Sequence, residues 1–194
     1  MVSSPIRQSL TIHDLANLPD DGRLRELVDG QIVEWDVPTL MHALVLARLA
    51  SELVVFVLKY RLGFVAAGDP MIKIEGSERD VRAPDIAFYA RRQLPDDAGA
   101  PATAVIPDLV VEVLSPSDRA DRVLDKVHDW LRAGVRLLWY VDSRTGVTTV
   151  YHGDRVSVVR SDDVLDGKDV VPGFEVRIGD ILRELQPSEA HLRE

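Results

Sequence analysis

The sequence contains no cysteine, and this absence removes several kinds of chemistry. Without thiols the chain has no disulfide, no zinc site built on cysteine and no thiol nucleophile. The five histidines are scattered and do not show a metal-binding spacing such as His-Glu-x-x-His. A metal site in this chain would therefore be built mostly from oxygen ligands.

The chain also lacks an excess of positive charge. It has 23 basic side chains against 32 acidic ones, which gives a formal net charge of −9. An acidic surface of this size repels a phosphate backbone unless the positive charges are gathered locally. The charge argues against a general nucleic-acid coat protein. It is compatible with an enzyme whose acidic residues collect divalent cations.

Long uninterrupted hydrophobic runs and repeats are missing as well. Arg48 and Glu52 interrupt the longest apolar stretch, and the first residues, MVSSPIRQSL, do not resemble a signal peptide. We therefore expect no membrane association and, by elimination, a cytoplasmic protein. The length of 194 residues predicts one domain over residues 1–194, with a frayed tail at 186–194.

The first half of the chain predicts a hairpin and a long helix. Residues 24–35, LRELVDGQIVEW, alternate on both sides of Asp29-Gly30, a pair that favours a tight hairpin turn. Residues 40–62 are apolar nearly all round and predict a helix, with Gly63 placed to end it. A helix of this kind needs cover beyond one sheet, so we expect a homodimer.

The rest of the chain predicts strands on both sides of a second helix. This helix, SPSDRADRVLDKVHDWLRAG, is expected to begin at Ser117 or Asp118 as cap and to end at Gly134. The order predicts an α/β fold: a mixed sheet flanked by a long N-terminal helix and a crossover helix, with antiparallel strands added near the C-terminus. The strands are expected at FVAAG, MIKIE, APDIAFYA, PDLVVEVL and, as three strands, within RLLWYVDSRTGVTTVYHGDRVSVV.

Glu112 lies at the centre of the apolar run VVEVLSPS, where an ionised carboxylate is costly to bury. Because side chains on a strand alternate faces, Glu112 shares its face with Val110 and Leu114. One interpretation is an edge strand whose second face is half wet. The other requires a partner, and Asp85 on the preceding strand is the obvious one. Two carboxylates on one face of adjacent strands suit a hard cation such as Mg²⁺.

A basic group can reach the same level of the sheet. From Glu112 the strand climbs roughly 10 Å to Ser115, at about 3.3 Å per residue. The following helix descends a similar distance of about 10 Å to Lys126, at about 1.5 Å per residue. Lys126 thus returns to the level of Glu112 if the helix packs on the sheet. The alternative is an ordinary surface pair between Lys126 and Asp129, three residues further along the helix.

These residues resemble a known type of site. Pro84-Asp85, Glu112 and a lysine on the next helix look like a PD-(D/E)XK nuclease site in the variant whose lysine has moved from strand to helix, since Leu114 stands at the usual lysine position. The ordered segments RELVDGQIVE, RAPDIAF, PDLVVEVLSPS and AGVRLLWYVD are similar to the Uma-type "putative restriction endonuclease" family over about residues 10–182. The resemblance implies a restriction-endonuclease-like fold and the activity of a metal-dependent endonuclease. Such a hydrolase acts on nucleic acid, and DNA is the expected substrate.

The resemblance also implies roles for single residues. Asp85 and Glu112 would hold Mg²⁺ or Mn²⁺ together with the backbone carbonyl of Val113. Lys126 would position the attacking water and offset developing charge. Glu26, in RELVDG, matches the family's early glutamate and would complete the acidic cluster. Its alternative is a hairpin strand with one solvent-facing charge.

Two residues are secondary candidates. His42 matches a recurring family position, and a helix-start or structural role is the favoured interpretation. Asp108 follows Pro107 at the entry of the strand that carries Glu112, and is a weaker candidate ligand.

Two other functions compete with nuclease activity. The main alternative is a catalytically inactive nuclease-fold module with a binding or regulatory role. A third interpretation makes Asp85 and Glu112 the acid and base of a glycoside hydrolase. It leaves Lys126 without a role, and nothing in the sequence suggests a sugar cleft with aromatic platforms.

Overall fold

The computed structural model describes residues 9–19, 21–90, 96–116 and 118–185. The predicted tail at 186–194 and Ser117 lie outside these residues. The helices are α1 (Ile12–Ala16), α2 (Leu40–Tyr60), the 3-10 turn η1 (Ile74–Gly76), α3 (Ala120–Ala133) and α4 (Ile178–Glu184). The strands are β1 (Arg25–Val28), β2 (Gln31–Glu34), β3 (Phe64–Ala67), β4 (Ile72–Lys73), β5 (Val81–Arg82), β6 (Ile86–Tyr89), β7 (Leu109–Leu114), β8 (Leu137–Asp142), β9 (Thr148–His152), β10 (Arg155–Val159), β11 (Leu165–Asp166) and β12 (Glu175–Val176).

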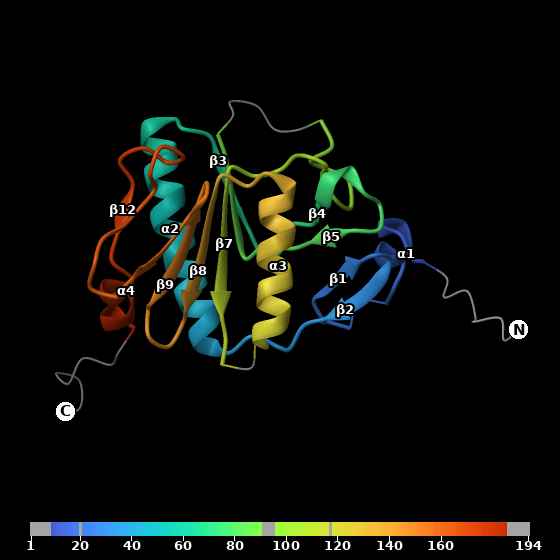
Figure 1. The fold of residues 1–194 in the computed structure, drawn as a ribbon, viewed down its shortest axis with the longest axis horizontal. Helices are drawn as coiled ribbons and strands as arrows, with labels where there is room; N and C mark the ends of the chain where they lie inside the picture. Colours follow the sequence, from blue (N-terminus) through green and yellow to red (C-terminus); the bar gives the residue numbers. More distant parts are fainter. Residues whose placement is uncertain (1–8, 20, 91–95, 117, 186–194) are drawn as a thin grey trace, which may run out of the picture.

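A six-stranded mixed sheet forms the centre of the fold (Figure 1), in the order β10-β9-β8-β7-β6-β3. β7 and β8 run parallel, joined by the crossover through α3, and the other neighbours are antiparallel. A smaller sheet has the order β2-β1-β5-β4, and β11 pairs with β12. The predicted mixed sheet with antiparallel strands added toward the C-terminus is confirmed.

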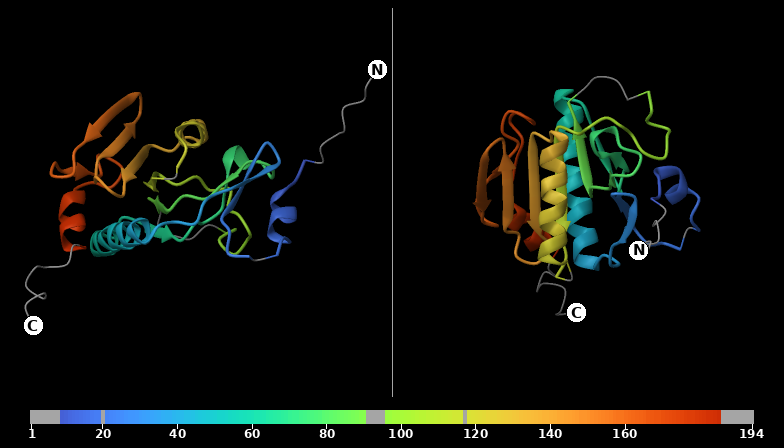
Figure 2. Two further views of the ribbon diagram at one scale, coloured as in Figure 1. Left: turned by 90° about the horizontal axis from the view of Figure 1, so that it is seen from below. Right: turned by 45° about the vertical axis from the view of Figure 1, so that its right-hand side comes forward.

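The two long helices cover opposite faces of the six-stranded sheet, as Figure 2 shows. On one face, Val45 and Leu49 of α2 pack in a core with Val111 of β7. On the other face, Trp130 of α3 packs with Val110 of β7. The strand therefore alternates between the two cores as predicted, and its even-numbered residues face α3. This parity places Glu112 on the α3 side.

The hairpin at the start of the fold also forms as predicted. Asp29 and Gly30 join β1 to β2 with φ angles of 50° and 73°, the left-handed region that a tight hairpin turn requires. β1 then pairs with β5 through Leu27 and Val81. This pairing brings the hairpin strand beside the segment that leads into β6.

The ends of both long helices differ in part from the prediction. The C-cap of α2 is Arg61, whose φ of 55° is left-handed, and not Gly63. Gly63 instead permits a close approach, since a Cβ there would lie 1.9 Å from the carbonyl oxygen of Tyr89. α3 ends at Gly134 as expected, but its N-cap is Arg119 and not Asp118.

One face of α2 is not covered by the sheet. Its exposed apolar side chains include Val55 and Leu58, which are 63% and 66% exposed. By length and composition alone, Leu40–Tyr60 is apolar enough to cross a membrane, a test that core helices of soluble proteins and signal sequences also pass.

Candidate active site

Asp85 and Glu112 lie next to each other where β6 and β7 stop pairing. The last paired residues are Ile86 of β6 and Val111 of β7. The next residue in line is Asp85 on the β6 side and Glu112 on the β7 side. The Val113 N–H donates to Asp85 Oδ2 at 2.6 Å. Because the N–H and C=O of one strand residue point to the same side, the Val113 carbonyl also faces Asp85. Asp85 therefore contacts the Val113 backbone directly, and Asp85, Glu112 and Val113 all line one cavity.

Glu112 is buried, with 6% of its surface exposed, and both of its oxygens accept hydrogen bonds. Trp130 Nε1 donates to Oε1 at 2.8 Å, and Lys126 Nζ donates to Oε2 at 3.0 Å. Burial raises the pKa of Glu112 to about 8, because the lowering by Lys126 is opposed by the negative charges of Asp85 and Glu26. The carboxylate is held rigidly, but its charge is not fully compensated. The interpretation of this strand as an edge strand with one partly solvated face is wrong, since β7 lies between β8 and β6 inside the sheet.

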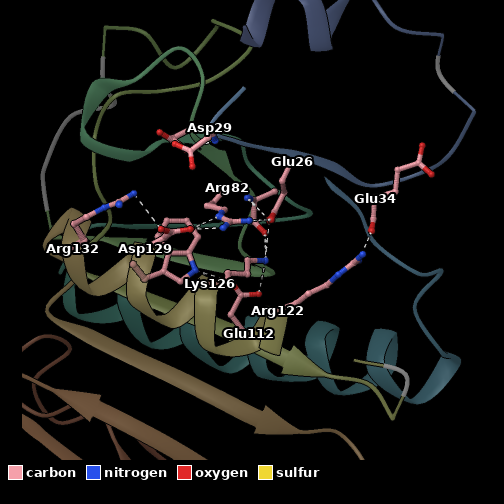
Figure 3. A network of polar contacts seen from close by, with 12 residues as sticks. Glu26, Asp29, Glu34, Arg82, Glu112, Arg122, Lys126, Asp129 and Arg132 are labelled. Carbon is pink, nitrogen blue, oxygen red and sulfur yellow. Dashed lines mark hydrogen bonds and ion pairs between the residues drawn. The ribbon is translucent and has the colours of Figure 1, made fainter. Parts of the chain in front are cut away.

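Lys126 points into the protein from the buried side of α3 (Figure 3). Its Nζ lies 3.0 Å from Glu112 Oε2, 3.0 Å from Glu26 Oε1 and 2.9 Å from the carbonyl oxygen of Ala83. All three ammonium hydrogens thus have protein acceptors. Burial favours loss of the proton, but the surrounding carboxylates outweigh it and raise the pKa of Lys126. Lys126 therefore remains a cation and cannot serve as a general base.

Glu26 lies behind Lys126 and is completely buried. Its Oε2 accepts a hydrogen bond from Arg82 Nη1 at 3.0 Å, and its Oε1 accepts one from the Ala83 N–H at 2.9 Å. Arg82 Nε also donates to Asp129 at 2.8 Å. The solvent-facing interpretation of Glu26 is therefore wrong, and so is the pairing of Lys126 with Asp129.

The charge of Glu26 is stabilised by this arrangement. Burial alone would raise the pKa of Glu26, but the charges of Lys126 and Arg82 lower it below its usual value. Glu26 does not line the cavity in front of Glu112. In this structure it anchors Lys126 directly.

His42 begins α2 and also reaches the site. Its backbone N–H is capped by Thr39, while its Nε2 lies 3.2 Å from Asp85 Oδ1. Burial lowers the pKa of His42, but the hydrogen bond and the charge of Asp85 outweigh it, so the pKa is raised. Asp108 lies at the opposite end of β7, where its Oδ2 accepts a hydrogen bond from the Ala90 N–H at 2.8 Å. The prediction of Asp108 as a candidate metal ligand is therefore wrong.

The clustered residues face a cavity of about 480 Å³. Trp35, Leu46 and Val123 are among the apolar residues that line it. Its polar lining includes His42, Asp69, Asp85, Glu112, Ser115, Lys126 and Tyr140.

Sequence reasoning missed four of the residues around this site. Asp69 is one, and burial together with the charge of Asp85 raises its pKa. Tyr140 stands beside Glu112 in the register of β7 and β8, so strand parity in RLLWYVD could have placed it. Arg82 and Trp130 carry no local signal, because their contacts with Glu26 and Glu112 join distant segments.

The donor set fits a divalent cation of the magnesium type. Mg²⁺ binds through one or two carboxylates and keeps several waters. Each oxygen of Asp85 and Glu112 has a second acceptor site beyond the hydrogen bond it already makes. In the part of the chain that the structure describes, no three His, Asp or Glu side chains are grouped closely enough to hold a metal by themselves. A metal would depend on these two carboxylates, the Val113 carbonyl and water.

Comparisons with known proteins identify the family and the fold of this chain. The profile of the Uma2 family, described as "Putative restriction endonuclease", matches residues 12–179. Among solved structures, the crystal structure of a putative nuclease belonging to DUF820 from Anabaena variabilis is similar, with a TM-score of 0.78 and 19% identity over 91% of this chain and 99% of that chain. No match is found among curated proteins. At this identity, the structural likeness establishes the fold.

Proposed function

Because the chain belongs to the Uma2 family of putative restriction endonucleases, we propose that it is a Mg²⁺- or Mn²⁺-dependent endonuclease that hydrolyses phosphodiester bonds in DNA. The observation that carries this proposal is the placement of Asp85 and Glu112 side by side at the wall of one cavity, with the cation of Lys126 behind them. Carboxylates suit a hard metal ion, and a buried cation suits a phosphate that gains negative charge.

Each residue of the site has a task in the proposed reaction. The Val113 N–H fixes the orientation of Asp85, while Trp130 and Lys126 fix Glu112. A divalent cation, when bound, would polarise a phosphoryl oxygen and lower the pKa of a water molecule. The positive charge of Lys126 would stabilise the negative charge that the phosphate gains in the reaction. To contact the attacking water, it would have to release the Ala83 carbonyl.

Replacement of Glu112 by Ala tests the assignment. The variant should lose metal-dependent cleavage of DNA, because one of two side-chain ligands is removed, while circular dichroism should show a folded protein. Isothermal titration should show Mg²⁺ or Mn²⁺ binding to wild type and a loss of at least tenfold in affinity in the variant. A folded Glu112→Ala protein that cuts DNA as fast as wild type would show that the assignment is wrong.

A second candidate is a nuclease-fold module that binds nucleic acid without cutting it. One observation favours it: the hydrogens of the Lys126 ammonium all bind protein acceptors. Metal titration distinguishes the two, since an inactive module does not require a metal site. If the protein binds DNA but does not cut it while Mn²⁺ is bound, the inactive module is supported.

A further inference from the structure

Buried polar atoms without a hydrogen-bond partner are concentrated in residues that line the cavity beside Glu112. Among the described residues, five buried side-chain polar atoms have no hydrogen-bond partner, and four belong to residues that line this cavity. These are Trp35 Nε1, His42 Nδ1, Ser115 Oγ and Tyr140 OH. Buried polar groups are normally paired, so each exception needs an explanation. Their concentration in one place indicates a binding site for a ligand with several polar edges.

Tyr140 gives the strongest support for such a site. It is 4% exposed, and its position beside Glu112 in the strand register puts it on the same face of the sheet as the carboxylates. Its hydroxyl has no hydrogen-bond partner among the described residues. A phenol hydroxyl is both a donor and an acceptor, so it can pair with either kind of group on a ligand.

The apolar part of the cavity favours a flat ring. Trp35, Leu46 and Val123 contribute to its lining. The Lys126 Nζ lies over one face of the Trp35 ring, 4.9 Å from its centre, so a ligand ring can stack only on the other face. A volume of about 480 Å³ lies within the range of roughly 300–1,000 Å³ for small-ligand sites. A nucleobase combines an apolar face, which stacks on aromatic rings, with hydrogen-bonding edges. The apolar and the polar lining of the cavity together match this combination.

The depth of the reacting groups favours a flexible strand. Asp85, Glu112 and Lys126 are only 9%, 6% and 5% exposed, so the phosphate must enter the cavity to reach them. A duplex is stiff and keeps its bases paired, whereas a single strand can bend and insert a nucleotide. Five acidic side chains line the cavity, against Arg23, Lys126 and His42. This charge opposes a duplex more strongly, because a duplex carries two phosphates per base step.

We propose that this cavity is a subsite for an unpaired nucleobase, and that single-stranded DNA is the preferred substrate over duplex DNA. Trp35 supplies the stacking surface, while the hydroxyls of Ser115 and Tyr140 bind the edge of the base. The base then lies beside the carboxylates that hold the metal. This inference rests on the proposed nuclease function for the cleavage step alone, because binding can be measured separately.

The test compares three fluorescent DNA molecules of one sequence: a single strand, the full duplex, and the duplex with a central unpaired bubble. Binding is measured by anisotropy in Ca²⁺, and cleavage in Mg²⁺ or Mn²⁺. The single strand should bind at least tenfold more tightly than the duplex, with the bubble between them and cut at the unpaired bases. Equal or tighter binding of the duplex would overturn the inference.

Variants locate the subsite. Trp35→Ala should weaken single-strand binding roughly tenfold, the size of one lost base stack, and leave duplex binding unchanged. Trp35→Phe should restore most of it, and Tyr140→Phe should weaken it less than Trp35→Ala. Tyr60→Ala, which removes an exposed aromatic ring outside the cavity, is the matched control. Unchanged single-strand binding by folded Trp35→Ala would also overturn the inference.

The outcomes separate this inference from the proposed function. Preferential binding of the single strand without any cleavage would support the subsite and contradict the nuclease. Cleavage of duplex and single strand at equal rates with equal affinities would support the nuclease and contradict the subsite. Absence of binding to all three DNA molecules would contradict both.

Discussion

At the residue scale, Glu112 shows how this fold accommodates a carboxylate inside a sheet. Two directed donors, Trp130 and Lys126, satisfy its oxygens, yet Asp85 and Glu26 add negative charge close by. The result is a pKa of about 8, far above the ordinary value of 4.5. A carboxyl group with this pKa holds a proton at neutral pH, so a divalent cation that binds to Glu112 has to displace that proton.

This raised pKa predicts a pH-dependent loss of stability. Below pH 4.5 Glu112 is protonated in both the folded and the unfolded chain. Between about pH 4.5 and 8 the folded chain holds a proton that the unfolded chain has lost, so the free energy of unfolding falls as pH rises. Glu112→Gln removes this penalty. In EDTA, the melting temperature of Glu112→Gln should rise relative to that of wild type between pH 5 and pH 8.5. The expected rise is about 2–4 °C for each kcal/mol of unfolding free energy that wild type loses.

Thermal denaturation of both proteins across this pH range checks the sign. Glu75→Gln, which changes an exposed carboxylate, controls for the loss of a surface charge. A difference between Glu112→Gln and wild type that is the same at pH 5 and pH 8.5 would contradict the raised pKa.

Arg82 is a residue whose loss should be costly. Its guanidinium is 4% exposed and binds both Glu26 and Asp129, so Arg82→Met removes one cation from each of two carboxylates and leaves Glu26 with Lys126 alone. Removal of one partner from a buried ion pair costs about 3–5 kcal/mol. Urea denaturation should show a loss of this size, and Arg82→Lys should lose less.

A double variant identifies the cause of that loss. If the unpaired charge of Glu26 is responsible, then Arg82→Met combined with Glu26→Gln should be less destabilised than the sum of the single changes. Additive losses would place the contribution of Arg82 elsewhere.

At the element scale, periodicity predicted most of what forms the site. Alternation along β7 placed Glu112 with Val110, and the rise of a strand against that of a helix brought Lys126 back to its level. These two rules use local geometry alone. The contacts of Arg82 and Trp130 depend on how β5 and α3 pack, and the end of α2 depends on a left-handed Arg61. Such features are set by tertiary packing and leave no signal in a single sequence.

Two glycines at helix ends give a prediction at this scale. Gly63 has a φ of 155° and would place a Cβ 1.9 Å from the Tyr89 carbonyl oxygen, so Gly63→Ala forces the backbone apart. Gly134 has a φ of 92°, but no described heavy atom lies within 4 Å of its Cβ position. Gly134→Ala should therefore cost only conformational strain, about 1–2 kcal/mol. Gly63→Ala should cost more, and urea denaturation should rank them in this order.

At the scale of the whole molecule, the uncovered face of α2 requires an explanation. The helix packs on the sheet through Val45, Leu49 and Leu53, while Val55 and Leu58 project away from it at helical spacing. An apolar patch of this kind on a protein surface marks a contact with another molecule. We propose that a second copy of the chain covers it, because a two-fold axis lets the same patch satisfy itself on both subunits.

Light scattering at micromolar concentration tests this proposal. Wild type should have the mass of a dimer, and Leu58→Glu should have that of a monomer, because a charge at the centre of the contact loses its water without gaining a partner. Val156→Glu changes an equally exposed valine on the edge strand β10, which belongs to a different surface, and should leave the mass unchanged. A monomeric wild type would contradict the dimer. Dissociation by Val156→Glu alone would move the contact to the sheet edge, where two β10 strands could pair through their unpaired backbone groups.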